Sequence, residues 1–287
     1  GGQPICSDKD YPTTTYTTTT TRTATTMTLT TVTTTSTTTW GSPSLFCIEV
    51  VRVRGYELPL VREQQKHRAS IFSCDEYAVF SDGGKSQLVG VGPDGRDIMT
   101  TVIPPIREAI GNLAAGATTN SWLNTQTFLQ VWDLAKKDGR IFQHDWIAKV
   151  DPDAVFFPAR LRRHMKPHTN RDAKLFVMNC NRFGAALYGS MEVFSRGAYE
   201  TYLRGADRCR NSLPWHGWGE DFYMSHCFDM LGVGRIYDFE LLADKRCVYR
   251  PCWDKSRVAF HDYKDASPSG TWFQCWNASG GPWNPAG

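Results

Sequence analysis

From residue 46 onward, apolar and polar residues recur with the periods that are typical of β-strands and of an α-helix. Residues 46–53 are rich in β-branched side chains and predict a strand, residues 57–70 predict a helix, and the apolar run 77–80 predicts a second strand. A glycine-containing turn at residues 81–84 ends that run. A strand, a helix and a strand within about 35 residues form a β-α-β unit, which implies a parallel sheet. The pattern therefore predicts an α/β fold with helices flanking a mostly parallel central sheet.

A second amphipathic pattern predicts a helix, and the strand that follows this helix ends in an acidic turn. Residues 121–137 predict a helix that Asp138-Gly139 ends, because apolar side chains recur on one face: Phe128, Val131, Trp132 and Ala135. Residues 146–150 predict a buried strand that runs directly into Asp151-Pro152-Asp153. Functional side chains of parallel sheets lie at the carboxyl ends of strands. The acidic turn, and Asp82 at the end of the earlier strand, are therefore candidate site residues.

The first 44 residues differ from the rest of the chain in composition. Twenty of the 27 residues from Thr13 to Thr39 are threonine, so this tract has few apolar side chains to offset the entropy of ordering. We expect residues 1–44 to form a disordered threonine-rich stalk, whether or not its hydroxyls carry O-linked glycans. Residues 45–287 are expected to form one domain, with a flexible C-terminal tail from about residue 277.

The net charge of the chain limits the classes of molecule that it can be expected to bind. Residues 45–287 carry the whole formal charge of +3, because the positive and negative charges of the stalk cancel one another. Proteins dedicated to nucleic acid are usually far more basic, so we expect no nucleic-acid partner, although a local basic pocket could hold one anionic ligand. No stretch reaches the ~18 consecutive apolar residues that a membrane-spanning helix needs.

Cysteine usage indicates an oxidising compartment. The chain has nine cysteines, no CxxC pair, and the N-glycosylation sequon Asn277-Ala278-Ser279. The alternative is a cytosolic enzyme with buried thiols. Eight cysteines fall in the second domain and could form four disulfides, whose connectivity stays open. Cys47 and Cys74 lie on predicted neighbouring strands, and Cys247 and Cys252 are close in sequence.

The acidic turn carries the most specific chemistry. Two carboxylates at positions i and i+2 can point to one side, and Pro152 keeps Asp151 extended. Oxygen ligands of this kind suit Mn²⁺ or Mg²⁺, which also bind substrate phosphates. The alternative interpretation is a plain turn, because Asp and Pro are common turn residues.

Three segments together resemble a known family. Residues 146–156, Trp-Ile-Ala-Lys-Val-Asp-Pro-Asp-Ala-Val-Phe, resemble the DxD region of GT-A fold glycosyltransferases, which use nucleotide-sugar donors. Residues 217–222, Gly-Trp-Gly-Glu-Asp-Phe, resemble the helix-opening Glu-Asp segment of the β-1,3-galactosyltransferase/Fringe-like group, and residues 260–264 resemble its late His-containing segment. The resemblance covers residues 46–276 and implies a Rossmann-like GT-A domain, although Asp-Pro-Asp replaces the Asp-Asp-Asp common in that group.

The resemblance also implies roles for individual residues. Asp151, Asp153 and His261 would hold Mn²⁺ or Mg²⁺, and Asp221 would be the catalytic base with Glu220 as its alternate. The expected contacts to a UDP-sugar come from Asp82, Lys149, Asp151, Trp218 and Lys264. Each has a structural alternative: acids complement a helix N-terminus, lysines lie on surfaces, and a tryptophan or a lone histidine often serves the core.

The sequence therefore predicts a metal-dependent hexosyltransferase that moves a sugar from a nucleotide-sugar donor to a hydroxyl of a glycan or glycoprotein, with inversion. Three alternatives remain: a retaining transferase on the same fold, a catalytically inactive carbohydrate-binding surface protein, and a calcium-stabilised adhesion domain. We expect the protein in the secretory pathway, in the Golgi lumen or secreted. Membrane attachment is expected only through an anchor outside this sequence.

Overall fold

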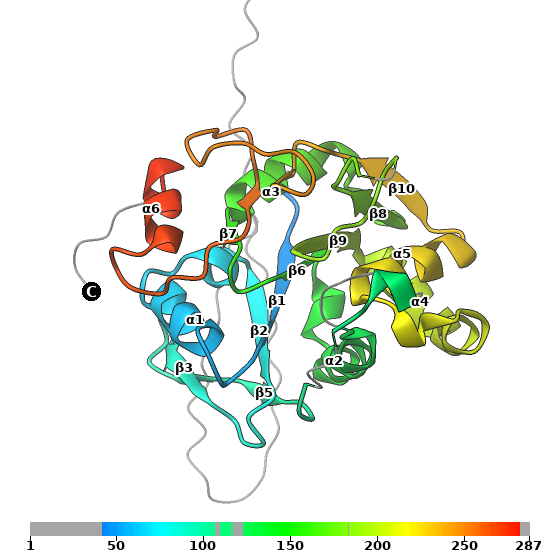
Figure 1. Ribbon diagram of the computed structural model, residues 1–287, viewed down its shortest axis with the longest axis horizontal. Coiled ribbons are helices and arrows are strands. Elements are labelled where there is room, and N and C mark those ends of the chain that lie inside the picture. Colours follow the sequence, from blue (N-terminus) through cyan, green and yellow to red (C-terminus); the bar gives the residue numbers. More distant parts are fainter. Residues whose placement is uncertain (1–41, 107–109, 116, 118–122, 183, 282–287) are drawn as a thin grey trace, which may run out of the picture. The chain divides into compact units, whose positions relative to one another are not determined.

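A seven-stranded sheet forms the centre of the domain (Figure 1). The computed structural model describes residues 42–106, 110–115, 117, 123–182 and 184–281, so the threonine-rich tract lies outside the described residues. The strand order is β10-β8-β9-β6-β1-β2-β5. In chain order these strands are β1 (Leu45–Val51), β2 (Glu76–Ser81), β5 (Thr101–Val102), β6 (Trp146–Val150), β8 (Leu175–Met178), β9 (Met191–Ser195) and β10 (Gly234–Tyr237).

The sheet is mixed but mostly parallel. The pairs β1·β2, β1·β6, β2·β5 and β8·β10 are parallel, whereas β9 runs antiparallel to both β6 and β8. β1 and β2 are connected through helix α1 (Glu57–Lys66), as the β-α-β pattern predicts. The expected α/β fold is confirmed.

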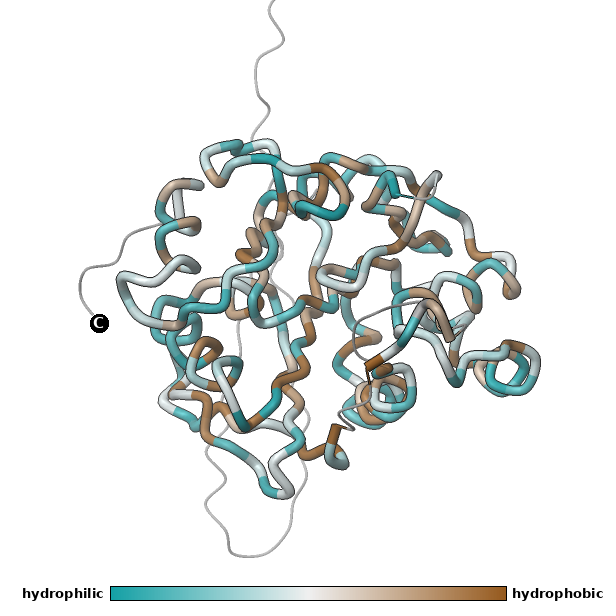
Figure 2. The backbone as a smooth tube through the Cα atoms, in the orientation of Figure 1, coloured by the Kyte–Doolittle hydropathy of each residue, from teal (hydrophilic) through white to brown (hydrophobic). Residues whose placement is uncertain are grey.

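Helices cover both faces of this sheet, and the side chains of β1 show why. Phe46, Ile48 and Val50 point into one core, with α2 (Thr125–Asp138), α4 (Arg196–Ser212) and α5 (Glu220–Met230). Leu45, Cys47 and Val51 point into the other, with α1 and α3 (Pro158–Met165). Because successive side chains of a strand face opposite sides, a strand buried on both faces is mostly apolar. The exception in β1 is Glu49, which is buried and accepts from the Ser70 hydroxyl at 3.1 Å. Figure 2 shows hydrophobic residues along the central strands.

Two smaller sheets complete the described part of the domain. β7 (Val155–Phe156) pairs antiparallel with β12 (Ala259–Phe260), which pairs parallel with β11 (Leu242–Ala243). Helix α6 (Thr271–Ala278) packs here through Trp272, Phe273 and Trp276. A separate hairpin joins β3 (Leu88–Val91) to β4 (Asp97–Met99). Short 3-10 helices occupy Ser70–Ser73, Leu113–Ala115, Arg140–Gln143, Lys166–His168 and Trp215–Gly217.

Most predicted elements occur, with corrected ends. The strand 146–150 has its predicted bounds, and Gly139 ends α2 with φ 80° in the left-handed region. The helix predicted over 57–70 ends at Lys66, because Arg68 and Ser70 adopt positive φ values that a helix excludes. The first residues of the helix predicted over 121–137 lie outside the described residues.

The described structure continues past residue 277, where we expected a flexible tail to begin. Asn277 and Ala278 belong to α6, and the side chain of Ser279 is buried. Burial of Trp272 and Trp276 holds this helix against the small sheet. Residues 282–287 lie outside the described part of the chain.

Four disulfides link the domain: Cys47–Cys74, Cys180–Cys247, Cys209–Cys227 and Cys252–Cys275. The proximity of Cys47 and Cys74 suggested by the strands is confirmed, whereas Cys247 and Cys252 do not pair with each other. Disulfides of this number are typical of secreted and extracytoplasmic domains. Among the described helices, none is long and apolar enough to cross a membrane.

Removing the bridge between the first two strands should destabilise the domain. The Cys47–Cys74 bridge closes a segment with a sequence separation of 27, so the Cys47→Ala/Cys74→Ala variant should lose about 2–4 kcal/mol of unfolding free energy. Urea denaturation followed by circular dichroism measures the loss. A reductant should destabilise the wild type more than this variant. An unchanged urea midpoint in the variant would contradict the assignment.

Candidate functional site

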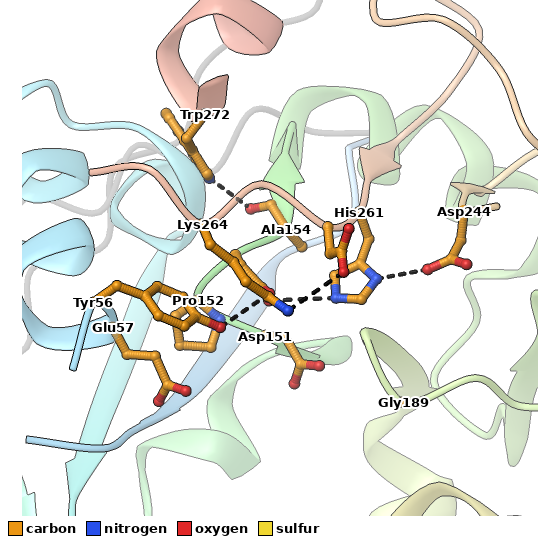
Figure 3. A network of polar contacts seen from close by, with 12 residues as sticks. Tyr56, Glu57, Asp151, Pro152, Ala154, Gly189, Asp244, His261, Lys264 and Trp272 are labelled. Atoms are coloured by element: carbon orange, nitrogen blue, oxygen red, sulfur yellow. Dashed lines mark hydrogen bonds and ion pairs between the residues drawn. The ribbon is translucent and has the colours of Figure 1, made fainter. Parts of the chain in front are cut away.

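The acidic turn follows the central strand β6 and is held from several sides. The Asp151 amide donates to the Ser190 carbonyl at 3.0 Å, which continues the pairing of β6 with β9. The buried Gln64 side chain of α1 donates to the Pro152 carbonyl at 2.7 Å, and the Trp272 indole of α6 donates to the Ala154 carbonyl at 3.2 Å. Contacts with the residue before β9, with α1 and with α6 therefore fix the position of the turn (Figure 3).

Asp151, Asp153 and His261 come together at this turn. Each offers one ligand atom, and these atoms lie within 4.8 Å of one another. His261 follows β12, and the antiparallel pairing of β12 with β7 places it beside the residues that follow the turn. The Tyr263 amide also donates to the Asp153 carbonyl at 2.9 Å. The pairing of two short strands thus brings together side chains that are more than a hundred residues apart in the sequence.

The His261 ring is held in one orientation (Figure 3). Its Nδ1 lies 2.6 Å from Oδ2 of Asp244, and its Nε2 lies 3.3 Å from Oδ1 of Asp153. Although burial lowers the pKa of His261, hydrogen bonds to Asp153 and Asp244 outweigh it and raise the pKa to about 10. Asp244 follows β11 and is buried. Sequence reasoning missed it, although an acid directly after a short apolar run was the available signal.

Asp153 is positioned by further contacts. The Tyr56 hydroxyl donates to its Oδ2 at 3.1 Å, and the Lys264 ammonium lies 3.8 Å from the same oxygen. Burial raises the pKa of Asp153, but the hydrogen bond and positive charge of His261, with Lys264, hold it below its ordinary value. The carboxylate is therefore ionised over the physiological range.

This donor set fits a divalent cation. Two carboxylates and one imidazole, the latter with its second nitrogen held by a carboxylate, form a mixed oxygen and nitrogen set that Mn²⁺ accepts. Ca²⁺ takes oxygen ligands almost exclusively, so the imidazole favours a transition metal over calcium.

A cavity of about 660 Å³ opens in front of these residues. Its volume is typical of a site for one small ligand. The carboxyl ends of β1 and β6, the segment before β9, the first turn of α5 and the segment after β12 all contribute to its wall. Basic side chains line it together with the acids: Arg52, Arg182, Arg246 and Lys264.

Lys149 lies beneath the cavity with its ammonium fully buried. Its Nζ is 2.7 Å from Asp151 and 2.8 Å from Glu220, and it donates to the Gly189 carbonyl. Glu192, its direct partner on β9, is 3.6 Å away. Burial lowers the pKa of Lys149, but these carboxylates outweigh it and hold the pKa well above its ordinary value. The ammonium therefore stays charged and links the acidic turn to α5.

Asp221 lies at the start of α5 and faces the cavity. Its Oδ2 accepts from the Gly189 amide at 3.0 Å, and its Oδ1 accepts from the Phe222 amide at 2.7 Å. Burial, followed by the negative charge of Glu220, raises the pKa of Asp221 to about 7. A carboxyl group that titrates near neutrality is suited to proton transfer.

The remaining residues that were predicted to contact the nucleotide sugar differ in whether they line the cavity. Lys264 lines the cavity, whereas Asp82, Lys149 and Trp218 are not among the described residues that line it. Asp82 follows β2, and its carboxylate accepts from the Val53 amide at 2.9 Å. Trp218 packs at the edge of the core, and its carbonyl accepts from the Thr125 hydroxyl at 2.8 Å.

Comparisons with known proteins give a limited result. No protein-family model matches the sequence, and no curated protein matches it. Among solved structures, the chain is similar to one described as "Crystal structure of a glycosyltransferase involved in the glycosylation of the major capsid of PBCV-1". The TM-score is 0.45 and the sequence identity 9%, and the match covers 83% of this chain and 98% of that chain. The function is therefore inferred from the residues of this chain.

Asp244 should control metal affinity without touching the metal. Because it holds Nδ1 of His261, the Asp244→Ala variant should bind Mn²⁺ about 10–100-fold more weakly. Calorimetric titration with Mn²⁺ measures the affinity. Asp238→Ala is the matched control, because Asp238 holds His164 at 2.7 Å in the same manner outside the cavity. Equal Mn²⁺ affinity in the two variants would contradict this role.

Proposed function

We propose that the chain is a metal-dependent glycosyltransferase that moves a sugar from a nucleotide-sugar donor, with UDP as the nucleotide, to a hydroxyl of a glycan or glycoprotein. One observation carries the proposal: a single cavity is lined both by the Asp151/Asp153/His261 cluster and by Asp221, whose pKa is near neutrality. The segments that carry these residues are those that resemble GT-A glycosyltransferases in sequence, which supports the same conclusion.

The donor diphosphate would bind at the acidic turn. Asp151, Asp153 and His261 would hold Mn²⁺ or Mg²⁺, which when bound neutralises charge on the departing diphosphate. Lys264 lines the cavity beside Asp153 and is suited to a second contact with phosphate oxygens. We assign Lys149 a supporting role, because its ammonium is already bound by Asp151, Glu220 and Gly189.

Asp221 is our proposed base, and the reaction is a single displacement. Its carboxylate takes the proton of the acceptor hydroxyl, whose oxygen then forms a bond to the anomeric carbon. The bond from that carbon to the diphosphate oxygen breaks, and its electron pair leaves with the diphosphate. Attack on the face opposite the leaving group inverts the configuration. Glu220 suits this role less well, because its carboxylate is paired with Lys149 at 2.8 Å.

We also place the enzyme in the secretory pathway, with the Golgi lumen as the proposed compartment. The four disulfides support an oxidising environment. Nucleotide-sugar donors and glycoprotein acceptors would then meet there. Asp82 and Trp218 remain proposed contacts of the donor that the cavity wall does not include.

Binding of UDP should depend on the metal. At a ligand concentration of about 100 times Kd, UDP with Mn²⁺ should stabilise the protein by about 2.7 kcal/mol, which raises Tm by several degrees. The Asp153→Asn variant should lose the part of the shift that needs Mn²⁺, because it removes one ligand charge while keeping the shape. GDP and CMP with Mn²⁺ are the comparison ligands. A Tm that rises with calcium alone and not with UDP and Mn²⁺ would instead support the adhesion-domain alternative.

Loss of Asp221 should change both the rate and its pH dependence. In the wild type, kcat/KM should rise with pH through about 7 and level off above it, because only the ionised carboxylate accepts a proton. The Asp221→Asn variant should lose about 10²–10⁴-fold in kcat and the limb near pH 7.

Asp229→Asn is the matched control for this experiment. Asp229 lies on the same helix but pairs with Arg235 on the surface, so its loss should leave the pH profile unchanged. Retained turnover in Asp221→Asn, or a product anomer with the configuration of the donor, would favour the retaining alternative and overturn the base assignment.

A further inference from the structure

The segment 245–255, between β11 and β12, concentrates positive charge and exposed aromatic rings. It holds four basic residues and one acid, a net charge of +3 that equals the charge of the whole chain. Trp253 is 70% exposed and Tyr249 is 61% exposed. Two large aromatic side chains exposed within five residues offer flat apolar surface of the kind that is enriched at interfaces. In Figure 1 the segment lies in the orange stretch between β10 and α6.

Covalent and polar contacts fix this segment. Cys247 is bridged to Cys180, and Cys252 is bridged to Cys275 of α6. The single acid, Asp254, accepts from both the amide and the hydroxyl of Ser256 and faces Arg257 at 3.4 Å. The segment is thus held in place before any ligand binds, which reduces the entropy cost of binding.

The cations of this segment are available to a ligand. Among the described residues, neither Lys245 nor Lys255 has an ion pair, and both are exposed. Arg250 faces Asp254 at 3.8 Å and donates to the carbonyl of its exposed neighbour Tyr249 at 3.0 Å. Guanidinium and ammonium groups of this kind bind carboxylates and sulfates through charge-assisted hydrogen bonds.

The segment leads into the cavity at the Asp221 side. Arg246 lines the cavity and donates to the Tyr188 hydroxyl at 3.2 Å. Tyr188 precedes Gly189, whose amide donates to Asp221. A molecule that lies across the segment and enters past Arg246 therefore meets Tyr188 and the Gly189 segment, which also contacts the proposed base.

We propose that residues 245–255 bind the acceptor, and that this acceptor is an oligosaccharide carrying carboxylate or sulfate groups. Tyr249 and Trp253 pack against the apolar faces of sugar rings, while Arg250 and Lys255 bind the anionic groups. The inference rests on the proposed function, because it names the acceptor class for that same site.

The test is calorimetric titration of the full chain with matched probes. Tetragalacturonate and its neutral methyl ester share one sugar backbone, but the ester replaces each carboxylate charge with a methyl ester, and a heparin-derived tetrasaccharide supplies sulfate groups. The wild type should bind at least one of the two anionic probes more tightly than the ester. Trp253→Ala and Arg250→Gln/Lys255→Gln should each weaken that binding about tenfold, as expected for the anchors of an interface. Tyr237→Ser, which removes a tyrosine that is 58% exposed on β10, and Lys136→Gln/Lys137→Gln are the controls and should bind normally.

Several results would overturn the inference. These are absence of binding by both anionic probes, equal binding of the methyl ester, full affinity in Trp253→Ala, or tighter binding of tetrathymidylate, which would indicate a nucleic-acid surface. Stabilisation by UDP and Mn²⁺, measured in the same preparations, reports the donor site separately. If that stabilisation is present while the probes do not bind, the acceptor inference fails and the proposed function stands. If the probes bind as expected without it, the proposed function fails and only the oligosaccharide surface is supported.

Discussion

The candidate site depends on one buried cation. Burying a lysine ammonium is costly unless carboxylates compensate for lost hydration, and Lys149 has three such groups within 3.6 Å. These groups come from the acidic turn, from β9 and from α5, so the compensation also fixes the distance between the turn and the helix. Removal of the cation would leave the carboxylates buried against one another. The same interaction thus stabilises the fold and brings the two proposed reactive groups to one cavity.

The antiparallel strand β9 makes this arrangement possible. It lies between β6 and β8 and places Glu192 directly opposite Lys149, on the face of the sheet that α5 covers. The segment before β9 then passes the cavity, where the Gly189 amide binds Asp221 and the Gly189 carbonyl binds Lys149. A side chain at Gly189 would lie 3.0 Å from Glu220 and 3.1 Å from Asp221. Close approach of these carboxylates, and not the backbone angles, therefore favours glycine at this position.

Local patterns in the sequence predicted the elements, whereas His261 could be placed at the site only through the resemblance to a known family. The strand 146–150, the end of α2 at Gly139 and the α/β class follow from periodicity and turn residues. The closeness of Asp151 and Asp153 follows from their spacing, but His261 joins them only through the pairing of β7 with β12, two strands too short to detect. Tyr56 could not be predicted, because its contact with Asp153 joins residues 97 positions apart, whereas the signal for Asp244 was an acid after a short apolar run. Arg160 of α3 is likewise buried, and it donates to the carbonyls of Arg257 and Ser279, which are distant in sequence.

The segment from β11 to α6 carries residues of the candidate metal site and two disulfides. β11, β12 and α6 are too short to be stable alone, yet they carry Asp244 and His261 and the contact from Trp272 to the acidic turn. Two of the four disulfides lie here, and they tie this segment to Cys180 at the cavity wall and to α6. In an oxidising compartment the segment is held and His261 stays beside Asp153. Backbone pairing of β12 with β7 and β11, and buried apolar side chains, hold the same residues without any covalent link. The two disulfides thus add a covalent constraint to the part of the domain that positions His261.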